Sequence, residues 1–568
     1  MAKAAVSVTT LLLILLLMVF LSGYTASPQH RIFINGSVLT MDENNAVAEA
    51  VSIRDGVIEA VGSNQDIQQL IKTDTQVTDL QGKALLPGFI DAHSHFPVAG
   101  LNAISADLSP PPVGSTGSMD LLLEQIRLKT ETTAAGEWIL GFGYDDSSLK
   151  EQRHPERREL DKIAPNHPVY LWHSSGHMGV ANSVALEKIG IDEATVNPPG
   201  GVLGRDLISG RLNGLLQEQA ALTLNDLISD FSVLDYYRIF DKATNEYVSQ
   251  GITTAQSGGI SLPLARALYW AAELRQLPFR LVVLPQDRGF GQQLLAGSLK
   301  AEEFNSDRFH IGPVKIVADG SVQGRTAFLT EPFYQNPDNK PGYRGFPAIS
   351  QADLTSKIGA YHRAGFQLAI HGNGDAGIDN VIQAFSAAQK GFPVTDPRMI
   401  LVHAQMARDD QLQAMRQLGI TPSFFPTHTY FWGDQHLSQF MGPERGPNMS
   451  PTGSAIKIGL KFSVHTDAPV TPIDPLGLLW STVNRRSVTG QLIGGEQRIS
   501  VMQALRAITI DAAWQVFQEN NRGSIEPGKL ADLVILSGNP LLAPGDIRQL
   551  RVEETIVGGV TVFSSQPE

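Results

Sequence analysis

The sequence contains no cysteine. This excludes disulfides, thiolate metal ligands and a cysteine nucleophile, so any bound metal must be held by nitrogen and oxygen ligands. Positive charge is also scarce, with 44 Lys and Arg against 57 Asp and Glu and a formal net charge of -13. Phosphate binding needs clustered Lys and Arg, and the chain has no basic cluster, which argues against a nucleic-acid partner.

An apolar run stands near the N-terminus, at residues 11–21, after a single early positive charge at Lys3. As a helix this run spans about 16 Å, well short of the roughly 30 Å hydrocarbon core of a membrane. Small residues follow it, and we predict a cleaved signal peptide over residues 1–27 and export to a periplasm-like space or secretion. The alternative is an uncleaved helix, starting as early as Ala4, that tethers the protein to the membrane. Tyr24 stands where a lipidated cysteine would be, which excludes lipidation there.

The two ends of the chain share a β-rich pattern. At 568 residues the chain exceeds a single core, so more than one packed unit is expected. Short apolar runs broken by Asn-Gly and Asp-Gly turns lie near the start, and similar runs return near the end. Because chain termini often lie close together, we predict one small β-sandwich domain made from residues 31–86 and 517–568, with residues 87–516 inserted between them.

The middle of the chain alternates strand-like and helix-like segments, which is typical of an α/β fold. Eight apolar, β-branched runs predict strands at residues 85–95, 252–256, 280–284, 314–319, 367–371, 399–403, 421–425 and 461–467. Eight strand–helix units predict a (β/α)8 TIM barrel. The first gap is too long for one crossover, so residues from about 101 to 249 form an insertion, with helices at 121–130 and 233–250. Insertions at the C-terminal face of a barrel usually cap the site.

Several of these strands end in side chains that bind metals. His93 and His95 are two residues apart, so on a strand both imidazoles point to the same face. His371 and His403 each close an apolar run before a loop, which gives four imidazoles in all, enough for two ions. Each of these histidines taken alone has a structural interpretation, but their convergence at one end of a barrel indicates a metal site.

Two further ionisable residues share this pattern. Lys315 lies inside a barrel strand, where an ammonium is costly unless it is paired or neutralised. A buried pair with Asp319, or a side chain that reaches outward to solvent, would each account for it. Asp467 ends the last strand, where it is either a metal ligand and proton acceptor or a helix N-cap. His465 lies one pleat deeper on the same face, and we interpret it as a partner of a ligand rather than a ligand.

These motifs resemble those of the amidohydrolase superfamily. The resemblance covers nearly everything after the signal segment, and its nearest branch is the one that contains N-substituted formamide deformylase. It rests on residues 87–95, 173–183, 251–254, 315–321, 371–375, 403–405, 465–469 and 523–533. It implies that His93, His95 and Asp467 hold one ion, that His371 and His403 hold a second, and that Lys315, carboxylated by CO₂, bridges the two. Zinc is the default metal for such a His and carboxylate site, although manganese, iron and nickel also suit it.

This resemblance implies a metal-dependent hydrolase that acts on a non-peptide carbon–nitrogen bond, in an N-substituted or N-acyl amide. A metal-activated hydroxide would attack the carbonyl, and Asp467 would carry the proton from the attacking water to the leaving nitrogen. An amidine deaminase or cyclic-amide hydrolase on the same scaffold is an alternative, although such deaminases usually lack the bridging lysine. A catalytically silent exported binding or regulatory protein is the alternative from another class.

The substrate-binding residues are harder to predict. His177 in the insertion is a candidate for contact with the substrate, and Asp375 follows the His371 strand. Trp172 and Tyr144 in the insertion, with the aromatic segment 424–432 after the seventh strand, would form apolar walls that favour an apolar N-substituent. Ordinary packing between barrel and cap explains these aromatics equally well. We expect a small-molecule amide as the partner and leave a homodimer open.

Overall fold

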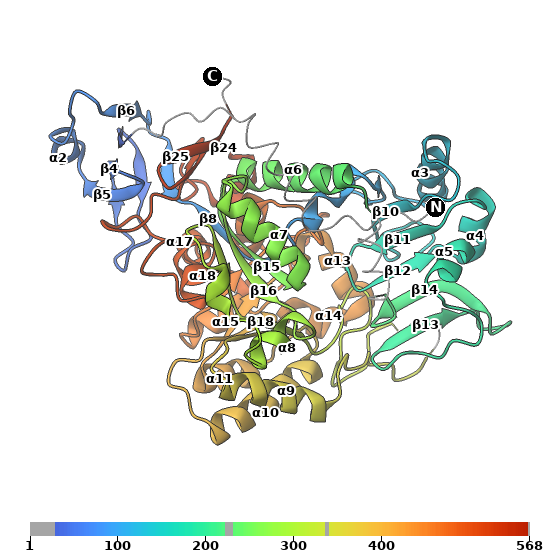
Figure 1. Ribbon diagram of the computed structural model, residues 1–568. Coiled ribbons are helices and arrows are strands. Elements are labelled where there is room, and N and C mark those ends of the chain that lie inside the picture. The colour runs from blue at the N-terminus through green and yellow to red at the C-terminus, as the bar shows by residue number, and fades with distance from the viewer. Residues whose placement is uncertain (1–28, 222–230, 336–339, 566–568) are drawn as a thin grey trace.

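The computed structural model describes residues 29–221, 231–335 and 340–565 (Figure 1). Within these ranges no helix has both the length and the apolar character needed to cross a membrane. The signal peptide predicted over residues 1–27 lies outside the described residues.

Parallel strands form the centre of the molecule, in two sheets. The first has the order β17-β16-β15-β8 and the second the order β18-β19-β20-β21-β22. Their bounds are β8 (Phe89–Ser94), β15 (Ile252–Ile260), β16 (Arg280–Pro285), β17 (Phe309–Ile311), β18 (Val314–Val317), β19 (Leu368–Gly372), β20 (Met399–His403), β21 (Ile420–Phe424) and β22 (Ser463–Val464). All eight strand positions predicted from the sequence are occupied, with β22 shorter than predicted.

The two sheets meet through a strand that is interrupted at Gly312 and Pro313. β17 precedes this break and pairs with β16, whereas β18 follows it and pairs with β19. Proline has no N–H to donate to a ladder, which accounts for the break. At the other seam the Asp467 N–H donates to the His93 carbonyl over 3.0 Å. Ladder hydrogen bonds therefore do not run continuously around the strands, although the α/β alternation is as predicted.

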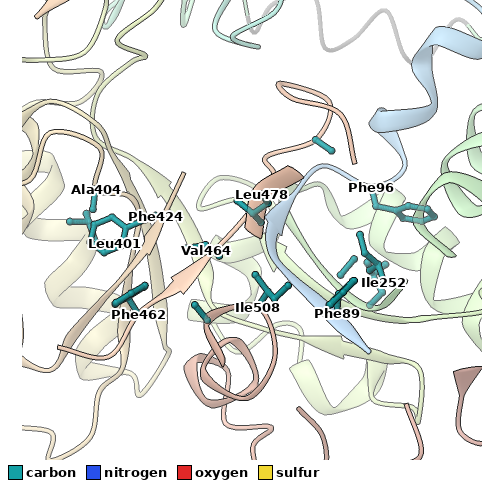
Figure 2. Close-up of a cluster of buried hydrophobic side chains, with 14 of the residues drawn as sticks. Phe89, Phe96, Ile252, Leu401, Ala404, Phe424, Phe462, Val464, Leu478 and Ile508 are labelled. Carbon is teal, nitrogen blue, oxygen red and sulfur yellow. The ribbon is translucent and has the colours of Figure 1, made fainter. Parts of the chain in front are cut away.

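Helices cover these strands and close the main core. They are α6 (Val233–Ser249), α7 (Leu262–Glu273), α8 (Phe290–Leu295), α9 (Gln351–Arg363), α10 (Asp375–Gly391), α11 (Asp409–Leu418), α15 (Thr452–Lys457), α16 (Pro475–Asn484), α17 (Val501–Ala507) and α18 (Ile510–Gln515). Local signals set their ends: the Ser350 side chain accepts the Asp353 N–H at the start of α9, and Gly419 ends α11 in the left-handed region. Figure 2 shows apolar side chains of the strands and helices, among them Phe89 and Phe424, in this core.

The insertion folds as an α/β unit of its own, which we call the cap (residues 98–218). Its sheet has the order β13-β14-β12-β11-β10-β9. Its elements are η1 (Val98–Ala103), β9 (Ala106–Asp107), α3 (Met119–Thr132), β10 (Ile139–Tyr144), α4 (Arg157–Ile163), β11 (Val169–His173), β12 (Met178–Ala181), α5 (Ser183–Lys188), β13 (Gly201–Arg205) and β14 (Leu212–Glu218). The helices predicted at 121–130 and 233–250 are α3 and α6. Figure 1 shows the cap beside the central strands, at the end of α6.

Strands from both ends of the chain pair with each other. One sheet has the order β5-β4-β1-β6 and a second the order β25-β24-β23-β7-β2-β3, in which β7 and β23 run antiparallel. The bounds are β1 (His30–Ile34), β2 (Ser37–Leu39), β3 (Val47–Ala48), β4 (Ala50–Arg54), β5 (Val57–Gly62), α2 (Asn64–Gln68), β6 (Gln76–Asp79), β7 (Ala84–Pro87), β23 (Leu533–Leu536), β24 (Val552–Val557) and β25 (Val560–Ser564).

A buried ion pair connects these terminal strands to the parallel strands. Arg280 opens β16 and donates from Nε and Nη2 to the two carboxylate oxygens of Asp532, over 2.6 and 3.0 Å. Asp532 stands directly before β23 and also accepts the Gly558 N–H. Both side chains of the pair are buried, with 5% of the Arg280 side chain and 4% of the Asp532 side chain exposed. This two-bonded geometry fixes one sheet against the other.

Candidate metal centre

Two histidines and an aspartate meet where β8 lies beside the end of β22. His93 Nε2 and His95 Nε2 lie 3.7 and 3.3 Å from Asp467 Oδ1. The three ligand atoms fall within 4.8 Å of one another, a spacing that could hold one ion. His93 and Asp467 are buried, whereas the His95 side chain is 36% exposed and opens the cluster to solvent.

Lys315 enters this cluster from β18. Its Nζ lies 3.0 Å from His93 Nε2, and no carboxylate among the described residues lies within ion-pair distance of it. The Lys315 side chain therefore points inward. It neither forms an ion pair with Asp319 nor reaches outward to solvent, the two alternatives that the sequence left open. Burial lowers the pKa of Lys315 to about 7, although the charge of Asp467 acts in the opposite direction. A buried amine without an anionic partner favours the neutral form.

His371 and His403 come from the ends of the two next strands, β19 and β20. Their ring centroids lie 4.6 Å apart, and the centroid of His403 lies 5.6 Å from that of His93. His403 Nδ1 lies 4.0 Å from Asp467 Oδ2. Both His403 and Asp467 adopt left-handed backbone angles, with φ of 74° and 55°. Such angles are uncommon for residues other than glycine and cluster at functional sites.

The protonation states of these groups suit metal binding. Burial holds the pKa of His93, His371 and His403 well below the ordinary histidine value, so the rings carry free lone pairs at neutral pH. Burial tends to raise the pKa of Asp467, but its close contact with His95 and the charges of neighbouring groups outweigh burial, so the pKa lies below its usual value. Neutral imidazoles and an ionised carboxylate are the forms that bind divalent metals.

The unsatisfied atoms of the cluster test whether a metal fits. Asp467 Oδ1 and His371 Nδ1 are buried and have no hydrogen-bond partner. Buried polar atoms without partners are rare and usually point to an ion or water. Nitrogen and oxygen donors with several neutral imidazoles match the preferences of zinc and similar divalent ions. The described residues therefore fit a divalent metal.

Two buried aspartates, Asp91 and Asp319, hold these side chains in place. The Asp91 carboxylate accepts hydrogen bonds from the backbone N–H and the hydroxyl of Thr466, and so fixes the residue before Asp467. Burial raises the pKa of Asp91 to about 7, against the effect of these hydrogen bonds. Asp319 accepts backbone N–H groups of Asn373 and Gly374, which orders the loop after His371. The sequence suggested Asp319 only as a partner of Lys315, and no local signal predicted the contacts that either aspartate makes.

His465 is a hydrogen-bond partner of the cluster. Its Nε2 lies 3.0 Å from His403 Nδ1 and its Nδ1 lies 2.8 Å from the Ser423 hydroxyl. Both ring nitrogens are thus engaged, and the ring also stacks on Phe425 with centroids 5.1 Å apart. His403, His465 and Asp467 do satisfy the spacing for a metal site. With its Nε2 used by His403, His465 is better placed to orient that ring, as predicted.

The four residues predicted to bind substrate lie in different surroundings. His177 of the cap reaches the cluster, with its ring centroid 4.9 Å from that of His371. Tyr144 is fully buried and its hydroxyl bonds to His154, while Trp172 packs on Tyr170 inside the cap. Asp375 accepts hydrogen bonds from Thr330 and pairs with Arg408 at the start of α10. The structure therefore brings only His177 to the cluster; Tyr144, Trp172 and Asp375 serve packing and loop structure.

A cavity of about 410 Å³ lies beside the cluster, between the cap and the loop after Asp467. Residues 468–473 form one wall, and Phe142, Phe431 and Trp432 are among its aromatic lining. Two of these three belong to the segment 424–432 that the sequence placed at the mouth, whereas Trp172 and Tyr144 are not part of the lining. The lining is mixed, because Asp107, Asp145 and Glu246 also belong to it, so the cavity offers both apolar and polar contacts to a small molecule.

A third group with metal-like spacing lies in the cap, formed by Asp145, Asp146 and His173. Its members are already engaged: His173 Nε2 bonds to Asp146 over 3.1 Å, and Asp145 accepts from the Trp432 indole N–H over 2.5 Å. Trp432 belongs to the segment after β21. These bonds connect the cap to the parallel-strand unit and explain the cluster without a metal.

Comparisons with known proteins agree with this geometry. Residues 76–563 match the model of the amidohydrolase family. N-substituted formamide deformylase from Arthrobacter pascens is 32% identical over 93% of this chain and 97% of its own, and the protein LONG AFTER FAR-RED 3 from Arabidopsis thaliana is 29% identical over 93% and 91%.

A solved structure shows the same fold. The uncharacterized metal-dependent hydrolase from Pyrococcus horikoshii OT3 superposes with a TM-score of 0.72 at 24% identity, over 91% of this chain and 99% of its own. The family match covers most of the chain, and the relative from Arthrobacter is similar along nearly its whole length. The protein is a hydrolase that belongs to the amidohydrolase family.

Proposed function

We propose that the protein hydrolyses the carbon–nitrogen bond of an N-substituted amide with two divalent ions, zinc by default. The convergence of six side chains carries this proposal: His93, His95, Lys315, His371, His403 and Asp467. We also infer that the parallel strands form the (β/α)8 barrel that positions these residues, because the four histidines and Asp467 lie at or just after the carboxyl ends of strands and Lys315 reaches the same cluster from within β18.

We propose the ligand sets that the resemblance to the family implies, and the spacing of His93, His95 and Asp467 supports the first of them. His93, His95 and Asp467 would hold one ion, and His371 with His403 the other. We propose that Lys315 is carboxylated and supplies oxygens to both, since its amine is buried, inward and without an acidic partner. Divalent ions at such a site polarise a carbonyl and lower the pKa of water from 15.7 to about 7.

The remaining steps belong to residues of the chain. Asp467 is ionised at neutral pH and can accept the proton of the attacking water, then donate it to the departing nitrogen. Asp91 holds Thr466, and thereby the backbone that carries Asp467, in register with β8. The aromatic part of the cavity, with Phe142, Phe431 and Trp432, would accept an apolar N-substituent.

The name of the relative from Arthrobacter suggests a formyl group as the acyl part. The amidine deaminase and cyclic-amide hydrolase alternatives are less favoured, because Lys315 lies within the cluster. All six ligands are present, which disfavours a catalytically silent protein.

The test combines metal analysis with a substrate screen. We expect two equivalents of metal in the wild type and hydrolysis of N-alkyl formamides, with one equivalent or fewer and no activity in Lys315→Ala. Lys461→Ala is the control, because that lysine lies over the Trp514 ring and away from the cluster. One equivalent unaffected by Lys315→Ala would favour a deaminase, and no metal would leave a binding protein.

We further propose that the protein is exported through residues 1–27. Cell fractionation with N-terminal sequencing of the mature protein tests this. Recovery of a soluble cytosolic protein that retains Met1 would contradict export.

A further inference from the structure

A histidine of the cap stands over the second half of the metal cluster. His177 lies in the turn between β11 and β12, and its ring tilts against that of His371 with centroids 4.9 Å apart. Its side chain is 19% exposed. Of its two ring nitrogens, only Nδ1 has a hydrogen-bond partner among the described residues, so Nε2 remains available.

The partner of His177 is a buried glutamate at the end of β14. Glu218 Oε2 lies 2.8 Å from His177 Nδ1, and the Glu218 side chain is 4% exposed. The two residues are joined a second time, because the Glu218 N–H donates to the His177 carbonyl over 2.8 Å. Glu218 adopts a left-handed φ of 52°, which is uncommon for a residue with a side chain. Two bonds and this backbone angle fix the ring firmly.

The loop after β18 leaves room for the glutamate. A Cβ at Gly320 would stand 2.1 Å from the Thr326 hydroxyl oxygen and 2.2 Å from Glu218 Oε1, so a glycine there leaves room for both side chains. Glu218 Oε1 is itself buried and without a hydrogen-bond partner. A buried carboxylate is costly unless it is paired, and His177 is the partner that the structure gives it.

We propose that His177 contacts the amide group of the substrate through Nε2 and that Glu218 is the positioning residue that holds the ring for this contact. The proposal rests on the proposed amide hydrolysis and adds a substrate contact supplied by the cap. Because the carboxylate takes the Nδ1 hydrogen, the opposite nitrogen is the one left for the substrate. Loss of one such bond weakens binding or reaction by about tenfold.

The experiment compares four variants of the metal-loaded protein on N-(2-phenylethyl)formamide. We expect His177→Ala and Glu218→Ala to lower kcat/KM by about tenfold or more, with bound metal and thermal unfolding unchanged. Glu218→Gln keeps a hydrogen-bonding group beside Nδ1 and should retain more activity than Glu218→Ala. Glu193→Gln is the matched control, because it removes one exposed carboxylate of the cap that pairs with Arg157. Added imidazole should restore part of the activity of His177→Ala, which a purely structural role would not allow.

A spectroscopic readout does not depend on turnover. In metal-free protein with ¹⁵N-labelled histidine, the His177 signal, assigned with His177→Ala, should show a hydrogen on Nδ1 and shift when the formamide is added. Glu218→Ala should abolish the Nδ1 signature. If the wild type cleaves no amide, the proposed function fails, and these spectra still decide the role of the pair.

Three outcomes would overturn the inference. The first is an unchanged kcat/KM in both alanine variants. The second is loss of bound metal from His177→Ala, which would make His177 a metal ligand. The third is a His177 signal that does not change in Glu218→Ala.

Discussion

The amine of Lys315 and the imidazole of His93 meet with Nζ and Nε2 3.0 Å apart, although the two residues lie on strands 222 positions apart in the sequence. At this distance the two nitrogens share one hydrogen bond, unless a metal ion or a carbamate occupies one of them. This contact gives the most direct tests of the metal centre.

Replacement of Lys315 by alanine should be reversible by an added carboxylate. If a carbamate bridges two ions, Lys315→Ala loses the bridge, and activity should fall by about a thousandfold, on the scale of several kcal/mol. Propionate can then enter the space of the side chain and supply the missing oxygens. Activity is measured with and without propionate, and Lys461→Ala with propionate is the control. Failure of every small carboxylate to restore activity or metal content would argue against the bridge.

Reconstitution should depend on pH and bicarbonate. Burial lowers the pKa of Lys315 to about 7, so the neutral amine that reacts with CO₂ dominates only above that pH. Metal-free protein should therefore recover more activity at about pH 8 than at about pH 6, and only when bicarbonate is present. The measurement is activity and bound metal after a fixed incubation. Equal recovery in CO₂-free buffer would count against carboxylation.

His465 should support metal affinity through His403. His465→Leu removes the hydrogen bond to His403 Nδ1, leaving that ring free to rotate, and metal affinity should fall about 10- to 100-fold. Competition with a coloured chelator measures the affinity. The control is His362→Leu, since His362 is also buried but bonds to the Phe392 carbonyl at the far end of α9. If both variants lose metal equally, the effect is one of folding.

The ion pair between Arg280 and Asp532 should dominate the attachment of the terminal strands. Asp532→Asn leaves a buried guanidinium without its charge partner, which costs about 3–5 kcal/mol. Hydrogen exchange in β23 and β24 and the thermal midpoint report the loss. Asp307→Asn is the control, because its pair with Arg275 is exposed and contributes about 0–1 kcal/mol. Equal effects of the two substitutions would contradict a special role for Asp532.

The same pair sets a pH dependence. Burial tends to raise the pKa of Asp532, but Arg280 outweighs it and the pKa lies below its usual value. A carboxyl with a lowered folded pKa contributes stability that is present above the unfolded pKa of about 3.9 and is lost as pH falls through the folded pKa. The difference in thermal midpoint between wild type and Asp532→Asn should therefore be constant from about pH 7 to about pH 5 and shrink below about pH 4. A difference in thermal midpoint that grows in acid would mean that folding raises the pKa of Asp532 instead of lowering it.

The sequence predicted the strand positions and the family because its signals were local. Apolar runs marked β8, β15 and β19, and the histidines at their ends appear in fixed motifs. Nothing local distinguished Glu218, because a glutamate at the end of a polar strand is usually solvated. Its role depends on a contact with a turn 41 positions earlier and on an empty space at Gly320. For Tyr144 and Trp172 the sequence left a pocket wall and ordinary packing open, and only the tertiary structure shows that both pack within the cap.

A residue larger than glycine at position 320 would press on two oxygens at once, because an added Cβ would stand 2.1 Å from the Thr326 hydroxyl and 2.2 Å from the Glu218 carboxylate. A substitution there would therefore disturb both the loop after β18 and the acid of the cap, although it changes none of the proposed metal ligands.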